Sequence, residues 1–172
     1  MSARYGPPTL LADRHDLTAF GCRSPEQTEW LRRYARQSAG TGTICVFVVT
    51  EETGNEVVAY YAWCMAQLDR RAVPVRVQKG AGRYPQPVAL LARLGVDLDH
   101  EGRGLGAGLL QDVFRRIVQL SDGIGCRGLV VHAESEEARR FYLHLVPELQ
   151  PSPTDDLHLV LLLKDIRRTL TS

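Results

Sequence analysis

Residues 100–110, His-Glu-Gly-Arg-Gly-Leu-Gly-Ala-Gly-Leu-Leu, are the part of the chain whose types and spacing point most directly to chemistry. Three alternating glycines, Gly102, Gly104 and Gly106, fall between an apolar, strand-like stretch and an amphipathic helical pattern. Glycines at a helix start let backbone N–H groups approach a phosphate closely, and the helix dipole adds positive potential there. The spacing therefore predicts a phosphate-binding loop.

The same glycines, read as Gly102-x-Gly104-x-x-Ala107, also satisfy the relaxed dinucleotide-binding fingerprint. The surroundings argue against a nicotinamide site, because one βαβ unit follows the loop instead of several. The acid at the end of the next strand, Glu134, also lies considerably later than the roughly 20 residues expected for a ribose-binding acid. No Gly-Lys-Ser/Thr follows, which excludes a nucleoside triphosphate loop of that kind. A tight strand-to-helix turn without a ligand remains the alternative.

The elements that must position this loop are those of a mixed α/β, or α+β, domain. Ser24 is a predicted helix N-cap, with Pro25 in the first turn and Gln27 completing a capping box, and Ser135 caps a later helix. Residues 69–86 lack periodicity and predict a long loop with room for a short strand. A single crossover surrounds the glycine loop. The expected strands are 43–50, 56–68, 88–96, 128–133 and 157–163, and the later helices are 104–121 and 135–145.

The composition is that of a soluble globular protein, with 172 residues in one expected domain, 44% apolar residues and a formal net charge of +1. No apolar run approaches the roughly 20 residues of a membrane span, and no secretion signal is expected. Four scattered cysteines predict reduced thiols in a cytoplasmic protein. The five histidines share no metal-like spacing, so no metal is expected.

Several motifs together resemble the GNAT superfamily of acetyl-CoA-dependent N-acetyltransferases. They are Leu94-Gly95-Val96-Asp97, Gly102-Arg103-Gly104-Leu105-Gly106, Leu109-Leu110, Ala138 and Phe141-Tyr142. The resemblance implies a GNAT-type fold over residues 1–172, a central mixed sheet flanked by helices. It also implies that the glycine loop binds the coenzyme A pyrophosphate through backbone amides, that the preceding strand hydrogen-bonds the pantetheine arm, and that Tyr142 faces the thioester sulfur. The implied coenzyme-binding residues are Leu94, Val96, Arg103, Gly104, Gly106 and Ala107.

A closer likeness covers most of the chain, and it is to the GNAT toxins of bacterial toxin–antitoxin modules. It rests on Trp30-Leu31 with Ala35, Ala59-Tyr60-Tyr61-Ala62, Pro87-Val88-Ala89-Leu90-Leu91-Ala92-Arg93-Leu94, Val130-Val131-His132-Ala133 and Leu161-Leu162-Leu163-Lys164-Asp165-Ile166. Such toxins acetylate the amino group of aminoacyl-tRNA and block translation. The likeness implies a ribbon-helix-helix antitoxin as partner and a homodimer.

The chain departs from the family pattern at three places. Glu101 stands where glutamine or arginine often opens the loop, which would place a negative side chain beside the phosphates. Ser135 replaces a frequent asparagine, and the usual Gly-Phe after the tyrosine is replaced around Val146-Pro147. None of these removes a group that acetyl transfer requires.

Tyr142 is the candidate general acid. A phenol with a pKa near 10 is close to matched to a departing thiolate, whose acid has a pKa near 8.5. Backbone N–H groups near Leu94 and Val96 are the candidate oxyanion donors. No side chain stands out as a general base, which favours an α-amine, with a pKa near 7.7–8.0, over lysine, near 10.4, as acceptor.

Basic residues provide the sequence's own indication of a nucleic-acid substrate. Residues 69–86 hold five basic side chains and one acidic one. The predicted tRNA phosphate track comprises Arg32, Arg36, Arg76, Lys79 and Arg83. The alternative is an ordinary solvated loop. Two other functions stay open: acetylation of a small-molecule or protein amine, and a coenzyme A-binding module without turnover.

Overall fold

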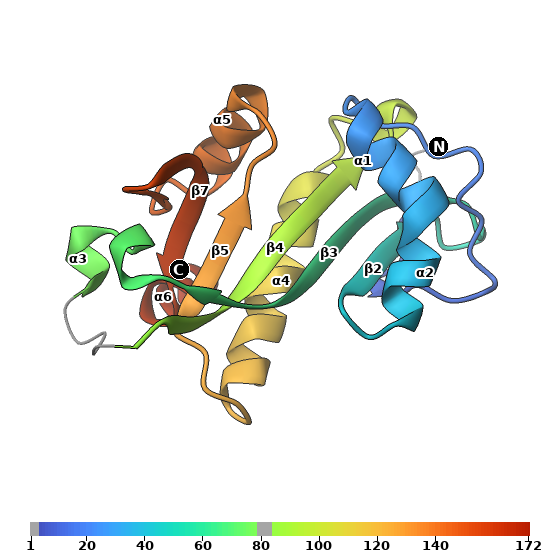
Figure 1. Cartoon of the computed structure of the whole chain (residues 1–172). Coiled ribbons are helices and arrows are strands. Elements are labelled where there is room, and N and C mark those ends of the chain that lie inside the picture. Colours follow the sequence, from blue (N-terminus) through green and yellow to red (C-terminus); the bar gives the residue numbers. More distant parts are fainter. Residues whose placement is uncertain (1–3, 79–83) are drawn as a thin grey trace. The chain divides into compact units, whose positions relative to one another are not determined.

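The computed structural model describes residues 4–78 and 84–172, and it leaves out the side chains of Arg76 and Val77. The strands form a seven-stranded sheet in the order β1-β2-β3-β4-β5-β7-β6, and helices connect and follow them along the chain (Figure 1). This mixed α+β arrangement confirms the predicted fold class. Among the described residues, no helix combines the length and apolar character needed to cross a membrane.

The regular elements are as follows. The strands are β1 (Thr9–Leu10), β2 (Cys45–Thr50), β3 (Val57–Leu68), β4 (Gln86–Val96), β5 (Gly128–His132), β6 (Gln150–Ser152) and β7 (Asp155–Leu162). The α-helices are α1 (Pro25–Glu29), α2 (Ala35–Gly40), α3 (Val75–Gln78), α4 (Leu105–Ser121), α5 (Glu136–Leu145) and α6 (Leu163–Thr171). A π-helical segment, Trp30–Tyr34, joins α1 to α2, and 3-10 turns occupy Arg70–Ala72 and Leu98–His100.

The strands and helices predicted from the sequence are all present, with ends shifted by no more than two residues. The short strand allowed for in 69–86 is wrong for the described part of that segment, which holds a 3-10 turn and α3. The capping box is only half formed. Ser24 Oγ accepts the Gln27 N–H, but Gln27 is buried and its Oε1 accepts from the Arg93 guanidinium instead.

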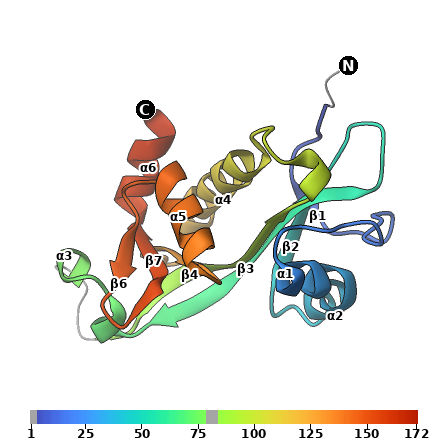
Figure 2. The same ribbon diagram turned by 90° about the horizontal axis from the view of Figure 1, so that it is seen from above.

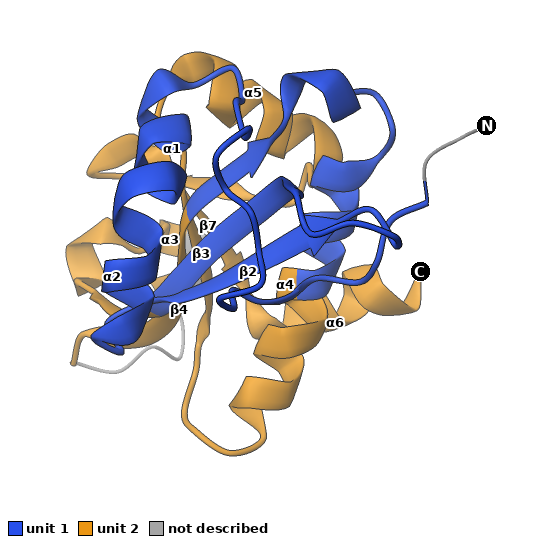
Figure 3. Cartoon of the chain, turned by 90° about the vertical axis from the view of Figure 1, so that its right-hand side faces the viewer, with its two compact units in different colours: residues 1–64, 93–112 blue, residues 65–92, 113–172 orange. Residues whose placement is uncertain are grey.

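The chain divides into two compact units, coloured separately in Figure 3. Unit 1 comprises residues 1–64 and 93–112, and unit 2 comprises residues 65–92 and 113–172. The elements β3, β4 and α4 each contribute residues to both units.

The core of unit 1 lies between the β2–β3 pair and the helical segment that residues 25–40 form. Those strands are antiparallel, with Val46 opposite Ala62 and Val48 opposite Tyr60, so alternate residues share one face. Leu31 and Ala35, four residues apart on the helical segment, are fully buried against that face. Other buried members of this cluster are Leu17, Phe20 and Val57.

Unit 2 contains a parallel pairing, between Ala89–Leu91 of β4 and Leu129–Val131 of β5. β5 continues into an antiparallel pairing with β7, which also pairs with β6. Helices α5 and α6 pack on β7 (Figure 2). The buried cluster of this unit consists of Leu68, Val73, Val88, Val130 and Val160. The four of these residues that lie in strands belong to the apolar runs from which the strands were predicted.

The backbones of β5 and β7 approach each other closely at Gly128. A Cβ there would lie 2.3 Å from the Leu161 carbonyl oxygen, so Gly128→Ala forces the β5 and β7 backbones apart. We expect a loss of about 1–3 kcal/mol in the free energy of unfolding, measured by urea titration. Gly125→Ala is the matched control, because a Cβ there meets nothing within 4 Å among the described residues. Equal midpoints for the two variants would contradict the close approach.

Candidate functional site

The β4 strand leads to the glycine loop and extends beyond its pairing with β5. The parallel register covers Ala89–Leu91 of β4, whereas β4 itself runs to Val96. The predicted coenzyme-contacting residues Leu94 and Val96 lie in this last part of the strand and are half-buried. Backbone groups there are not used by the parallel ladder, as a strand that hydrogen-bonds an extended ligand requires.

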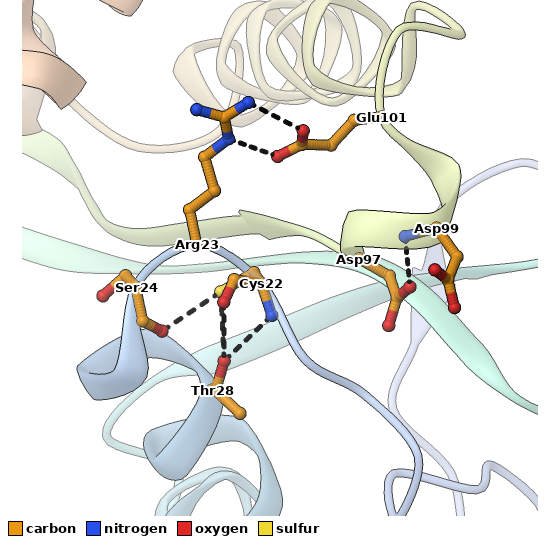
Figure 4. Close-up of polar contacts among 7 residues, drawn as sticks. All are labelled: Cys22, Arg23, Ser24, Thr28, Asp97, Asp99 and Glu101. Carbon is orange, nitrogen blue, oxygen red and sulfur yellow. Dashed lines mark hydrogen bonds and ion pairs between the residues drawn. The ribbon is translucent and has the colours of Figure 1, made fainter.

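Asp97 fixes the turn between β4 and the loop. Its backbone N–H donates to the Val58 carbonyl oxygen at 2.8 Å. Its carboxylate accepts from the Asp99 N–H (Oδ1, 2.9 Å; Figure 4) and from the Gly21 N–H (Oδ2, 3.0 Å). The Leu98 N–H returns a bond to the Gly21 carbonyl oxygen at 2.9 Å. The loop therefore begins from a turn tied to both β3 and the segment before α1.

Two of the three predicted glycines require their lack of a side chain. Gly102 and Gly104 have φ of +75° and +79°, in the left-handed region that other residues rarely adopt. A Cβ at either would meet nothing within 4 Å in the described part of the chain, so this face of the loop is open. This open face leaves room for a phosphate beside the loop backbone, and the N-terminus of α4 follows directly.

Helix α4 begins at Leu105, directly after the glycine turn. Its first intrahelical bond joins the Gly108 N–H to the Gly104 carbonyl oxygen at 3.0 Å. The N–H groups of Leu105, Gly106 and Ala107 therefore precede the helical ladder and have no partner within it. Oriented N–H groups at a helix N-terminus are suited to a diphosphate.

Glu101, the unexpected acid at the loop start, is paired. Arg23 donates from Nε to Oε1 at 2.8 Å and from Nη2 to Oε2 at 3.1 Å, a bidentate ion pair (Figure 4). The sequence did not indicate Arg23 as the partner of Glu101, because the two residues lie 78 positions apart and share no local pattern. The carboxylate therefore does not face the glycine loop as an uncompensated charge.

Arg103, a predicted coenzyme-binding residue, is bonded to the N-terminal segment. Its Nη1 donates to the Tyr5 hydroxyl at 2.9 Å, and that hydroxyl lies 2.7 Å from His100 Nδ1. If Tyr5 donates to Nδ1, His100 carries its proton on Nε2, which lies 3.7 Å from Glu51 Oε1. The side chain of Arg103 is exposed, and the bond to the Tyr5 hydroxyl fixes the position of its guanidinium.

Tyr142 lies in unit 2, on α5. Ser135 caps this helix, its Oγ accepting the Ala138 N–H at 3.1 Å, so the serine performs the capping role expected there. Tyr142 is 4% exposed, and its ring centroid lies 5.4 Å from that of Phe141. The helix ends with the Val146 N–H donating to the Tyr142 carbonyl oxygen at 2.8 Å.

The environment of Tyr142 differs from the one assumed from sequence. Burial, and secondarily the negative charge of Glu134, raises the pKa of the phenol well above its ordinary value near 10. The phenol is therefore protonated throughout the physiological range. Its match to a thiol is therefore poorer than the sequence suggested, because a phenol with a higher pKa gives up its proton less readily.

Of the five predicted tRNA-contacting residues, the structure gives the side chains of two. Lys79 and Arg83 lie outside the described residues, as does the side chain of Arg76. Arg32 lines a hollow of about 560 Å³ beside α1, together with Thr18, Cys22, Thr28, Glu29 and Arg33 among others. The Arg36 guanidinium donates to the Ala12 carbonyl oxygen at 3.0 Å and to that of His15, so this side chain also supports the fold.

Unit 2 contains a histidine pair that the sequence did not predict. His132 and His158 face each other across β5 and β7, with His158 Nε2 2.8 Å from His132 Nδ1. Sequence spacing gave no indication, since the pair depends on strand register. Among the described residues, no group of three or more His, Cys, Asp or Glu side chains is arranged to hold a metal ion.

Comparison with known proteins agrees with this geometry. The sequence model of the Acetyltransferase (GNAT) family matches residues 11–145. A tRNA-acetylating toxin of Mycobacterium tuberculosis (strain ATCC 25618 / H37Rv) is 40% identical over 163 residues, which are 95% of each chain.

Two solved structures share the fold. AtaT complexed with acetyl-methionyl-tRNAfMet has a TM-score of 0.87 at 24% identity, over 96% of this chain and 98% of that one. A Tyr-to-Phe mutant of the AtaT toxin bound to the C-terminus of the antitoxin AtaR and acetyl-CoA has a TM-score of 0.81 at 21% identity, over 98% and 99%. With the glycine loop, the strand before it and the family match agreeing, the chain belongs to the GNAT family of acetyltransferases.

Proposed function

We propose that this chain is a toxin N-acetyltransferase that transfers the acetyl group of acetyl-CoA to the α-amine of aminoacyl-tRNA and so blocks translation. The observation that carries the proposal is the 40% identity, over 95% of both chains, to a tRNA-acetylating toxin. The open glycine loop supports the proposal as well, because acetyl transfer requires a site that binds the coenzyme's phosphates.

The glycine loop and the end of β4 bind acetyl-CoA in this proposal. Backbone N–H groups at Gly104, Gly106 and Ala107 receive the pyrophosphate, and the Arg103 guanidinium adds a cation at the loop. Backbone groups of Leu94 and Val96 hydrogen-bond the pantetheine arm and polarise the thioester carbonyl. The acetyl group comes from the coenzyme, a co-substrate, and no metal takes part.

The acetyl transfer needs one proton donor, and the proposal assigns that role to Tyr142. The neutral amine nitrogen attacks the thioester carbonyl carbon, and the carbon–sulfur bond breaks. The Tyr142 hydroxyl gives its proton to the departing sulfur, the new amide nitrogen releases one proton to water, and solvent returns a proton to the tyrosinate. The raised pKa keeps the phenol protonated, and it also makes the phenol a weaker acid toward the thiolate than an ordinary tyrosine.

The substrate class is tested by offering competing amines to the purified enzyme. Aminoacyl-tRNA is expected to be acetylated faster than a lysine peptide at equal concentration, because about half or more of an α-amine is neutral near pH 8, whereas lysine is almost fully protonated. Acetylation of the peptide or of a small amine, with aminoacyl-tRNA untouched, would replace the proposal by a GNAT enzyme of another substrate.

Arg32 offers a test of the tRNA track at a residue whose side chain is described. Arg32→Glu is expected to weaken tRNA binding several-fold at low salt and to reduce the salt dependence, because a phosphate contact is lost and repulsion added. Filter binding across a salt series measures both. Arg168→Glu on α6, another exposed arginine, is the matched control. Affinity equal to the control's would remove Arg32 from the track. The proposal keeps the other four predicted residues there, which are Arg36, Arg76, Lys79 and Arg83.

The proposal extends to assembly and location. Residues 1–172 act as one domain, since β3, β4 and α4 each pass from one compact unit to the other. A ribbon-helix-helix antitoxin neutralises the enzyme, which works as a homodimer in the cytoplasm. The complex of AtaT with the C-terminus of AtaR supports a protein antitoxin as the partner. Size-exclusion chromatography with light scattering measures the oligomeric state.

A further inference from the structure

The ion pair between Arg23 and Glu101 has a consequence for the coenzyme site. We propose that Arg23 is a positioning residue for acetyl-CoA: it neutralises Glu101 and so keeps the start of the glycine loop compatible with the coenzyme's phosphates. This inference rests on the proposed binding of acetyl-CoA at that loop. It assigns a role to a side chain on a different element, the segment just before α1.

The backbone that carries Arg23 is held from two sides. On the helix side, Thr28 Oγ1 accepts the Cys22 N–H at 2.9 Å, and Cys22 Sγ lies 3.3 Å from both that oxygen and the Ser24 carbonyl oxygen (Figure 4). On the loop side, Asp97 Oδ2 accepts the Gly21 N–H at 3.0 Å. These bonds hold the segment that carries Arg23 close to the glycine loop.

Gly95 shows how closely this segment packs on β4. A Cβ at Gly95 would lie 3.0 Å from the Tyr60 ring, 3.2 Å from Cys22 Sγ and 3.4 Å from the Phe20 ring. The strand and the segment before α1 meet without room for a methyl group. The geometry that brings Arg23 to Glu101 is thus built into the packing of unit 1.

Glu101 directly precedes Gly102, so its carboxylate lies at the edge of the predicted phosphate cradle. Without a partner, that charge would repel a diphosphate at short range. The bidentate guanidinium, at 2.8 and 3.1 Å, cancels the charge in a fixed orientation. The pair is solvent-accessible, with side chains 68% and 33% exposed, so its own contribution to folding is small. Its removal therefore changes the electrostatics of binding more than the fold.

The test is a double-mutant cycle on coenzyme A binding to the full chain, measured by isothermal titration calorimetry. Arg23→Ala is expected to raise the Kd for coenzyme A about fivefold to tenfold, because Glu101 then faces the phosphates unpaired. Glu101→Gln removes the repulsive charge and is expected to bind at least as tightly as the wild type. The double variant is expected to bind like Glu101→Gln, which is the non-additive result that charge compensation requires.

Arg33→Ala is the matched control, because Arg33 forms a similarly exposed ion pair with Glu29 at 3.2 Å. It is expected to leave coenzyme A binding unchanged. A second readout separates electrostatics from structure: with acetyl-pantetheine, a donor without phosphates, Arg23→Ala is expected to retain the wild-type kcat/KM.

Four results would overturn the inference. They are unchanged binding in Arg23→Ala, a double variant as weak as Arg23→Ala, an equal loss in Arg33→Ala, and an equal loss with acetyl-pantetheine. Failure of the wild type itself to bind coenzyme A would instead overturn the assignment of the loop, and the inference with it.

Discussion

Tyr142→Phe is expected to lower kcat for acetyl transfer by about 10²–10⁴-fold while leaving the KM for acetyl-CoA nearly unchanged. The substitution removes the proton donor and keeps the ring that packs beside Phe141. Because the phenol is buried and the ring is retained, the free energy of unfolding is expected to change little. Steady-state kinetics with aminoacyl-tRNA as acceptor measure the effect.

Tyr84→Phe provides the control, since Tyr84 is 81% exposed and its hydroxyl has no proposed role. It is expected to retain wild-type kinetics. A Tyr142→Phe enzyme with undiminished kcat would remove the tyrosine from the chemical step and leave the coenzyme-binding part of the proposal standing.

The raised pKa of Tyr142 gives the pH dependence a definite sign. Burial and Glu134 disfavour the tyrosinate, so the donor keeps its proton well into the alkaline range. The wild-type rate is therefore expected to rise with pH as the acceptor amine loses its proton, and to show no fall below about pH 9. A descending limb between pH 8 and 9 that disappears in Tyr142→Phe would contradict the burial-raised pKa.

The second large effect is expected at Gly104. Gly104→Val places a β-branched residue at φ of +79°, which costs about 1–3 kcal/mol unless the turn relaxes. Relaxation would turn the N–H groups at the start of α4 away from the bound phosphates. We expect the Kd for coenzyme A to rise about 30- to 100-fold, measured by calorimetry.

Gly108→Val is the matched control for this loss. Gly108 lies one turn into α4, without a positive φ, and a Cβ there also meets nothing within 4 Å among the described residues. Valine and glycine differ little in helix propensity, so the variant is expected to fold and bind normally. Equal affinities for the two variants would contradict the left-handed turn as the basis of binding.

Long, regular elements were predictable because their signals are local. β3 follows from a long run of apolar and aromatic residues and α4 from 3.6-residue periodicity, and the caps at Ser24 and Ser135 place two helix starts. The elements that were missed lack such signals. β1 has two residues and β6 three, while α6 begins at Leu163 directly after β7 with no side-chain cap.

The candidate site was predictable to the extent that backbone geometry dictates residue type. Left-handed turns select glycine, so Gly102 and Gly104 stand out in the sequence. The partners of charged side chains cannot be recognised in the sequence in this way. Arg23 reaches Glu101, and Arg103 reaches Tyr5, only through tertiary packing. Arg36 shows the converse, since a residue predicted to contact tRNA is bonded to backbone carbonyl oxygens.

The most direct measurement is a cell-free translation reaction supplied with acetyl-CoA and the purified protein, with mass spectrometry of the aminoacyl-tRNA. Translation is expected to stop, acetylated aminoacyl-tRNA is expected to accumulate, and both effects are expected to be lost in Tyr142→Phe. Translation that continues normally, with a protein that acetylates another amine in the same buffer, would contradict the proposed function.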